Sequence, residues 1–209
     1  FSTKITEYRD LPDELISILM ALPKNTRPMD VLQMAVSSLG TFYDLEVSPE
    51  KVKSKKYERD YFLNTSAALI GALGSIVAAW HRIRNAQEPI TSKDDLSYAE
   101  NFLHMLGAEK ITPLMTRIMD ATLVLHGEHT INASTFTAMV TSSTLANASQ
   151  VVASAIGSLS GPLHGGANEK VVAMLQKINS KDDIRPWLDE TLKAKNVVWG
   201  MGHREYSVK

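Results

Sequence analysis

The chain has 209 residues, of which 44% are hydrophobic, and its formal net charge at pH 7 is −1. This composition suits a globular protein, and the charge balance gives no electrostatic basis for binding nucleic acid or an anionic membrane surface. Because the sequence contains no cysteine, it excludes disulfides, zinc–thiolate sites and thiol nucleophiles, and it is compatible with a reducing compartment.

Hydrophobic residues recur with a helical period along the first half of the chain. A proline near the start, followed by acidic residues, predicts a helix within Leu11–Pro23. A second helix is predicted over Pro28–Leu39, with Gly40 in the stop position. The charged stretch Ser48–Asp60 is interpreted as a solvated linker or an exposed helix face. A long helix is expected from about Asp60 to Asn85.

The longest apolar run, Ala67–Trp80, is too short to span a bilayer and contains glycine and serine. It is therefore interpreted as part of a buried helix. Its small residues, Gly71, Gly74, Ala78 and Ala79, allow helix axes to approach closely. Such a face serves either tight packing inside one chain or a helical sandwich between two subunits, and both interpretations stay open.

The second half of the chain predicts further helices by the same criteria. Their expected positions are 95–106 with a glycine stop, 113–125, two Ala/Ser/Thr-rich helices within 132–161, one beginning near 167–168, and one within 181–194. The sequence contains no convincing alternating strand pattern, so the predicted fold class is all-α.

The chemistry is expected to rest on His, Asp, Glu and Arg, because the sequence contains no cysteine and no GxSxG, phosphate-loop or HExxH motif. His81 and His104 are interpreted as ordinary helix residues. His126 and His129 have the spacing of a metal-binding pair, but Gly127 breaks the helix that would align them, and no third ligand lies nearby in sequence. The alternative is a polar histidine that points from a helix end into a cleft.

His164 lies between Pro162 and the pair Gly165–Gly166, directly before a predicted helix. The partial positive charge at a helix amino end disfavours the imidazolium form, and a neutral imidazole can donate an N–H bond to a developing enolate oxygen. The alternative is a simple turn in which His164 caps the helix. A second lone histidine, His203, follows Gly200–Gly202, which indicates either close approach of the backbone to a ligand or another segment, or a connecting loop.

Four stretches, taken together and in this order, resemble the citrate synthase family: RPMDVLQMAVSSLG, HGEHTINASTFTAMV, SGPLHGGANEKVVAML and WGMGHREY. The combination of GPLHGGANE with a later GMGHR is highly specific, and the style of the motifs is prokaryotic. The resemblance covers essentially the whole chain. It implies a multi-helix, citrate-synthase-like large domain over residues 1–165 and the beginning of a smaller helical domain over residues 166–209.

The resemblance also implies roles for individual residues. His164 matches the histidine that stabilises the enol of the acetyl thioester, and His203 matches the one that polarises the oxaloacetate carbonyl. His129 matches a histidine that helps to hold oxaloacetate. The loop that contacts the adenine part of coenzyme A is matched by Gly200, Met201 and Gly202. No metal and no cofactor are expected, because acetyl-CoA is a substrate.

The implied activity is that of an acyltransferase of the tricarboxylic acid cycle, which condenses acetyl-CoA with oxaloacetate to citrate and CoA through an enol intermediate. The implied partners are these two substrates and a second copy, in a homodimer or a higher homo-oligomer built from dimers. In relatives the subunit interface is formed by helices that match Pro28–Leu39, Asp60–Arg84 and the pair within 132–161. Neither nucleic acid nor a membrane is an expected partner, and the expected location is cytoplasmic.

Three alternatives remain at this level. A 2-methylcitrate synthase would use propionyl-CoA, and one methylene in an apolar pocket discriminates by only about 1–3 kcal/mol. The others are a helical metal-binding protein and a non-catalytic assembly module. We expect a chain that is cut at both ends, with the aspartate base and the oxaloacetate-binding arginines of the family downstream of Lys209. The residues that do not match the base are Asp182, Asp183 and Asp189.

Overall fold

The computed structural model of this chain describes residues 1–128 and 130–202, and every regular element among them is a helix. The all-α prediction is therefore confirmed. The chain forms two compact units, Phe1–Ser158 and Leu159–Lys209. This division falls slightly before the expected boundary between residues 165 and 166, and the assignment of large and small domains stays a prediction.

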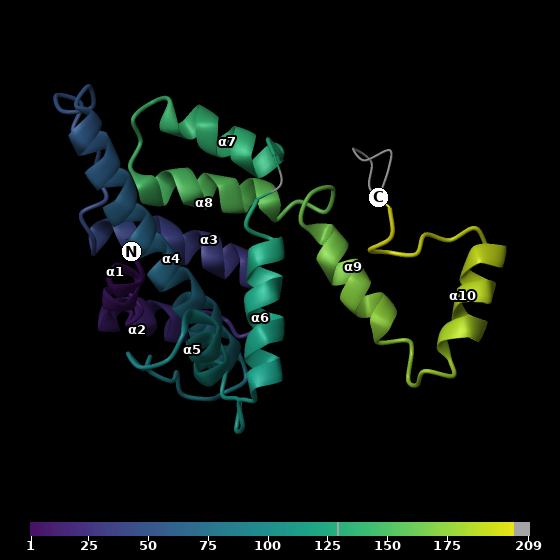
Figure 1. Cartoon of the computed structure of the whole chain (residues 1–209). Helices are drawn as coiled ribbons and strands as arrows, with labels where there is room; N and C mark the ends of the chain where they lie inside the picture. The colour runs from purple at the N-terminus through teal and green to yellow at the C-terminus, as the bar shows by residue number, and fades with distance from the viewer. Residues whose placement is uncertain (129, 203–209) are drawn as a thin grey trace. The chain divides into compact units, whose positions relative to one another are not determined.

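Figure 1 labels the helices in chain order. The first unit contains α1 (Ser2–Glu7), α2 (Asp13–Ala21), α3 (Pro28–Ser38), the 3-10 turn η1 (Leu39–Thr41), α4 (Lys55–Arg84), α5 (Tyr98–Met105), α6 (Pro113–Leu125) and α7 (Ala133–Ser142). Helix α8 (Ala148–Leu159) belongs to it up to Ser158. The second unit contains α9 (Gly166–Leu175) and α10 (Ile184–Lys193). Each helix predicted from the sequence is present.

Helix α4 begins earlier than predicted, at Lys55 rather than near Asp60. The reason is local: the Ser54 hydroxyl accepts a hydrogen bond from the backbone N–H of Tyr57 at 3.4 Å and caps the helix. The second half of the charged stretch is therefore the exposed first turns of a helix rather than a linker.

Helix α4 forms the centre of the first unit, because α1, α2, α3 and α5 all pack against it. The largest buried side chains of the core around it include Leu15, Leu19, Val31, Val36, Leu39, Ile76 and Trp80. By length and composition alone α4 could cross a membrane, since an 18-residue window has a mean hydropathy of 1.7. More than half of that window, 56%, is buried by the other helices, as in the core helix of a globular unit, which agrees with the buried helix predicted for Ala67–Trp80.

The small residues of α4 serve packing within this chain. A Cβ atom added at Gly71 would lie 2.6 Å from the carbonyl oxygen of Ile5 in α1. One added at Gly74 would lie 3.0 Å from the Tyr98 hydroxyl in α5. Tight packing inside one chain therefore accounts for both glycines, and the interpretation of this face as a helical sandwich between two subunits stays a prediction.

Helix α3 ends at Ser38, close to the predicted position before Gly40, but the glycine does not act as a left-handed stop. The chain continues through η1, and Gly40 does not adopt the left-handed conformation that a helix stop uses. A Cβ at this position would lie 2.8 Å from the Ser149 hydroxyl of α8. The glycine is thus explained by the close approach of another helix, which has no local signal in the sequence.

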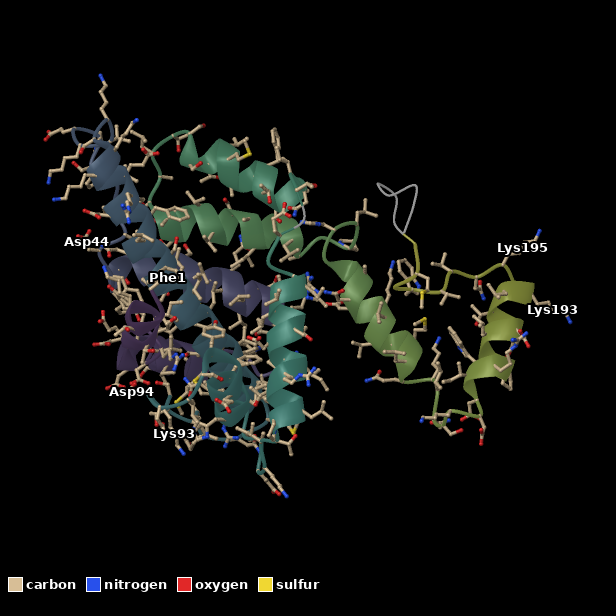
Figure 2. The ribbon with its side chains drawn as sticks, in the orientation of Figure 1. Phe1, Asp44, Lys93, Asp94, Lys193 and Lys195 are labelled. Carbon is tan, nitrogen blue, oxygen red and sulfur yellow. The ribbon has the colours of Figure 1, made fainter. Side chains whose placement is uncertain are left out.

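Three helices end in a left-handed residue with the hydrogen bonds of a Schellman motif. After α5 this residue is Gly107, with φ +91°, which fulfils the predicted glycine stop. After α4 it is Ala86, with φ +57°, and after α10 it is Lys195, with φ +56°. Lys195 is labelled in Figure 2. The two non-glycine residues hold a conformation that costs about 1–2 kcal/mol for a residue with a Cβ atom.

Helices α6 and α7 expose an unusual number of large hydrophobic side chains. More than half of the surface of each is accessible for Leu114, Ile118, Val124, Leu125, Phe136, Met139 and Val140.

Candidate active site

His164 lies in a closed turn between α8 and α9. Its backbone N–H donates to the carbonyl of Gly161 at 3.0 Å, which closes a β-turn with Pro162 in the second position, where proline is favoured. The next N–H, that of Gly165, donates to the carbonyl of Leu159 at 3.0 Å. Two consecutive backbone hydrogen bonds therefore fold the chain back on the end of α8, and α9 starts immediately afterwards.

The two glycines after His164 have different roles. Gly165 has φ −81° and ψ −5°, an ordinary right-handed conformation. A Cβ there would nevertheless lie 2.3 Å from the Leu159 carbonyl oxygen, whereas one at Gly166 would lie 3.8 Å from the Pro162 Cβ. Only the first position requires glycine, and it does so because of close contact. Gly165 is also the N-cap residue of α9, so the histidine precedes the capping position.

The second glycine-rich segment does require special backbone angles. Gly200 has φ +91° and Gly202 has φ +77°, a region that only glycine enters at little cost. The exposed Met201 lies between them. The backbone angle therefore accounts for glycine at both positions, and close approach to a ligand stays a prediction.

This segment packs against the first two turns of α9. A Cβ at Gly200 would lie 3.4 Å from the Val171 side chain, and the Lys170 ammonium lies 4.2 Å from the centre of the Trp199 ring. Val171 is the sixth residue of α9, which puts it about 8 Å along the axis from the start of the helix. The structure therefore brings the approach to the second motif onto the helix that begins beside His164. His203 itself lies outside the described residues.

His129 also lies outside the described residues, in the connection between α6 and α7. The neighbouring His126 ends α6, and its Nδ1 is 2.7 Å from the carbonyl oxygen of Thr122. Asn132 caps α7 by accepting a hydrogen bond from the backbone N–H of Thr135 at 2.9 Å. One of the polar residues that follow His129 in sequence, Asn132, therefore has a structural role as a helix cap.

Within residues 1–128 and 130–202, no group of three His, Asp or Glu side chains is arranged to hold a metal ion, and His129, one of the two histidines weighed as metal ligands, lies outside these residues. His81 is exposed on α4 and His104 is half-buried on α5. Both are helix residues, as predicted.

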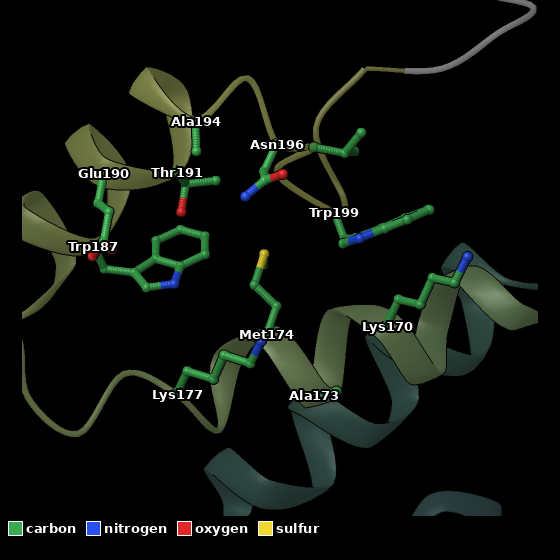
Figure 3. A pocket seen from close by; sticks show the side chains of 11 residues that line it. Lys170, Ala173, Met174, Lys177, Trp187, Glu190, Thr191, Ala194, Asn196 and Trp199 are labelled. Atoms are coloured by element: carbon green, nitrogen blue, oxygen red, sulfur yellow. The ribbon is translucent and has the colours of Figure 1, made fainter.

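An open pocket of about 650 Å³ lies within the second unit, between α9, α10 and the segment that follows α10 (Figure 3). Its lining includes Lys170, Met174, Trp187, Glu190 and Trp199. Trp199 directly precedes the left-handed glycine at position 200, so the pocket adjoins the segment predicted to bind coenzyme A. Sequence reasoning missed this pocket, although the side chains that α10 contributes recur at helical spacing.

The family model described as citrate synthase, C-terminal domain, matches residues 1–209. The citrate synthases of Acidithiobacillus ferridurans and Synechocystis sp. are 40% and 41% identical over the whole chain, which covers 53% and 51% of their lengths. A 2-methylcitrate synthase of Shewanella oneidensis is 37% identical over 99% of the chain and 52% of its own length. The chain therefore spans about half the length of these relatives.

Among solved structures, citrate synthase from Pyrobaculum aerophilum superposes with a TM-score of 0.84 at 32% identity, over 98% of this chain and 51% of that one. Citrate synthase from Thermotoga maritima superposes with a TM-score of 0.73 at 33% identity, over 100% of this chain and 52% of that one.

Proposed function

Since this chain belongs to the citrate synthase family, we propose that it serves the condensation of acetyl-CoA with oxaloacetate, which yields citrate and CoA. The observation that carries the proposal is the arrangement on α9. One histidine motif forms the closed turn at the start of that helix, and the approach to the second motif packs on its first two turns.

The reaction needs two hydrogen-bond donors and one base. A thioester methyl is a weak carbon acid, so its proton is removed only if a carboxylate base and a donor to the thioester oxygen are both fixed beforehand. We assign the donor to His164 and the polarisation of the ketone of oxaloacetate to His203. The new C–C bond then forms between the methyl carbon and the ketone carbon, and water releases CoA from the thioester. No carboxylate of this chain is assigned as the base.

Further binding roles complete the proposal. His129 holds oxaloacetate, and the backbone of Gly200, Met201 and Gly202 contacts the adenine part of CoA. The second assignment is supported by the left-handed glycines, which leave the backbone accessible where side chains would cover it. No bound cofactor is part of the proposal, because both reactants enter as substrates.

The exposed hydrophobic side chains of α6 and α7 support an assembly in which this surface is covered. We therefore include a homodimer, or an oligomer built from dimers, in the proposal. A cytoplasmic location is also proposed, on the similarity to bacterial citrate synthases. Sedimentation equilibrium of the intact protein measures its oligomeric state. A monomer at micromolar concentration would contradict it.

A second candidate is 2-methylcitrate synthesis from propionyl-CoA, which is favoured by one similar relative of that name. The two substrates differ by one methylene, so the discrimination between them is only about 1–3 kcal/mol. Release of free thiol from acetyl-CoA and from propionyl-CoA, each with oxaloacetate, distinguishes the two through the ratio of kcat/KM. Release from neither thioester would favour a non-catalytic assembly module.

The decisive test of the site is His164→Ala in the intact protein. Loss of a fixed donor to the enolate oxygen is expected to lower kcat by about 10²–10³-fold. Oxaloacetate binding, measured by calorimetry, should change little, because the partner of His164 is the thioester. His203→Ala should weaken both oxaloacetate binding and turnover. His81→Ala, at an exposed position of α4, is the matched control, and near-normal turnover of His164→Ala would reject the assignment.

A further inference from the structure

We propose that Gly165 is a positioning residue for His164, because only a residue without a side chain lets the turn between α8 and α9 close in the way that aims the imidazole. The inference rests on the proposed function, since it adds a residue that acts through the proposed catalytic histidine.

The contact at Gly165 is with the same atom that accepts its hydrogen bond. The N–H of Gly165 donates to the Leu159 carbonyl oxygen at 3.0 Å, and a Cβ would lie 2.3 Å from that oxygen. It would also lie 3.3 Å from the Leu159 carbonyl carbon and 3.2 Å from Cδ1 of the same residue. The obstacle is chiefly backbone at the end of a helix, so it cannot be relieved by rotating a side chain.

The consequence passes directly to the histidine. An added Cβ either breaks the hydrogen bond between Gly165 and Leu159 or shifts the entry of the chain into α9. Either change rotates the peptide bond between His164 and Gly165. The N–H of His164 stays hydrogen-bonded to the Gly161 carbonyl, so the rotation changes the orientation of the His164 side chain. A misplacement of about 1 Å of a catalytic group costs about 100-fold in rate, and the displacement required here is of that order.

The adjacent glycine provides a matched control. A Cβ at Gly166 meets only the Pro162 Cβ at 3.8 Å, which is ordinary van der Waals contact, and the position is the first residue of α9. Gly166→Ala therefore makes the same chemical change one residue further along, without moving the turn.

The experiment compares Gly165→Ala, Gly166→Ala and His164→Ala in the intact protein, with acetyl-CoA and oxaloacetate as substrates. Gly165→Ala is expected to lower kcat by about 100-fold and to leave the KM for oxaloacetate within about twofold. The reason is that the change displaces the His164 imidazole, which donates to the enolate oxygen in the transition state and does not bind oxaloacetate. Gly166→Ala is expected to retain the kcat of the unmodified protein. Equal kcat values for the two glycine variants would overturn the proposal.

A second readout separates positioning from general loss of structure. In protein labelled with ¹³C-histidine, the ring resonances of His164, assigned through His164→Ala, should shift in Gly165→Ala and not in Gly166→Ala, while the circular dichroism of both matches the unmodified protein. Unshifted His164 resonances would overturn the inference.

If Gly165→Ala does not fold, Pro162→Gly loosens the same turn without adding atoms. Pro162→Gly should also lower kcat, by a smaller factor than Gly165→Ala. An unchanged kcat would count against the proposal. If His164→Ala itself keeps normal turnover, the proposed function fails. If His164→Ala lowers kcat while Gly165→Ala leaves kcat unchanged, only this inference fails.

Discussion

Helices α1 and α4 pack closely at Gly71, because this residue has no side chain. The substitution Gly71→Ala adds a methyl group at the contact. The new Cβ would lie 2.6 Å from the Ile5 carbonyl oxygen and 2.9 Å from the Cβ of Tyr8. Because carbon atoms in contact are normally 3.5–4.0 Å apart, α1 must retreat by about 1 Å. The expected result is a less stable first unit.

Two opposing effects set the magnitude. Overpacking at a close helix contact costs about 1–3 kcal/mol, whereas replacing glycine by alanine inside a helix stabilises by about 1 kcal/mol. We expect a net loss of about 1 kcal/mol in the free energy of unfolding, which lowers the melting temperature by about 2–4 °C for a chain of this size.

The assay follows urea unfolding through Trp80, which lies in α4 with 3% of its surface exposed. The other tryptophans, Trp187 and Trp199, are replaced by phenylalanine so that the signal reports the first unit alone. Gly74→Ala on the same helix is the control. Its nearest neighbour is the hydroxyl of Tyr98, at 3.0 Å, a side-chain atom that donates to the Ile70 carbonyl oxygen at 2.8 Å, so the conflict is smaller than the one with backbone at Gly71.

The control should cost less than Gly71→Ala, because its closest contact is with one side-chain hydroxyl rather than with backbone, and because alanine is favoured over glycine inside a helix by about 1 kcal/mol. A Gly71→Ala protein as stable as the unmodified one, or more stable, would refute the reasoning. It would mean that α1 does not pack on α4 as closely as described.

Three further changes have defined outcomes. Ala86→Gly relieves the left-handed conformation after α4, where φ is +57°, and should raise the unfolding free energy by about 0.5–1 kcal/mol in a denaturant titration. Leu19→Ala removes a fully buried side chain and should cost about 3–4 kcal/mol, measured in the same way. In the capping box of α5, hydrogen bonds from the side chain and then from the backbone of Ser97 lower the pKa of Glu100. The lowered pKa contributes stability that is present above the unfolded-state pKa and is lost as the pH falls through the folded-state value. Ser97→Ala should therefore raise the Glu100 pKa in a ¹³C NMR titration, and an unchanged pKa would reject this cause.

The sequence alone was sufficient for features whose cause lies within a few residues. Helix type follows from the spacing of apolar residues, and the start of α3 at Pro28 and the stop at Gly107 follow from local backbone chemistry. The start of α4 also had a local signal, Ser54, which the charged composition of the surrounding stretch obscured. The histidine motifs were identified because each combines a histidine with glycines in one short stretch.

The tertiary structure alone decided why particular glycines are there. The sequence predicted close approach of a helix at Gly71, whereas Gly40 was interpreted as a helix stop and Gly165 as part of a turn. In each case the partner was not predictable: the atoms that exclude a side chain come from Ser149 for Gly40, Ile5 for Gly71 and Leu159 for Gly165. Two of these partners are distant in the chain, and the third is reached only because a turn folds back. A local pattern cannot encode a distance between segments, so close contact becomes visible only when the helices have packed.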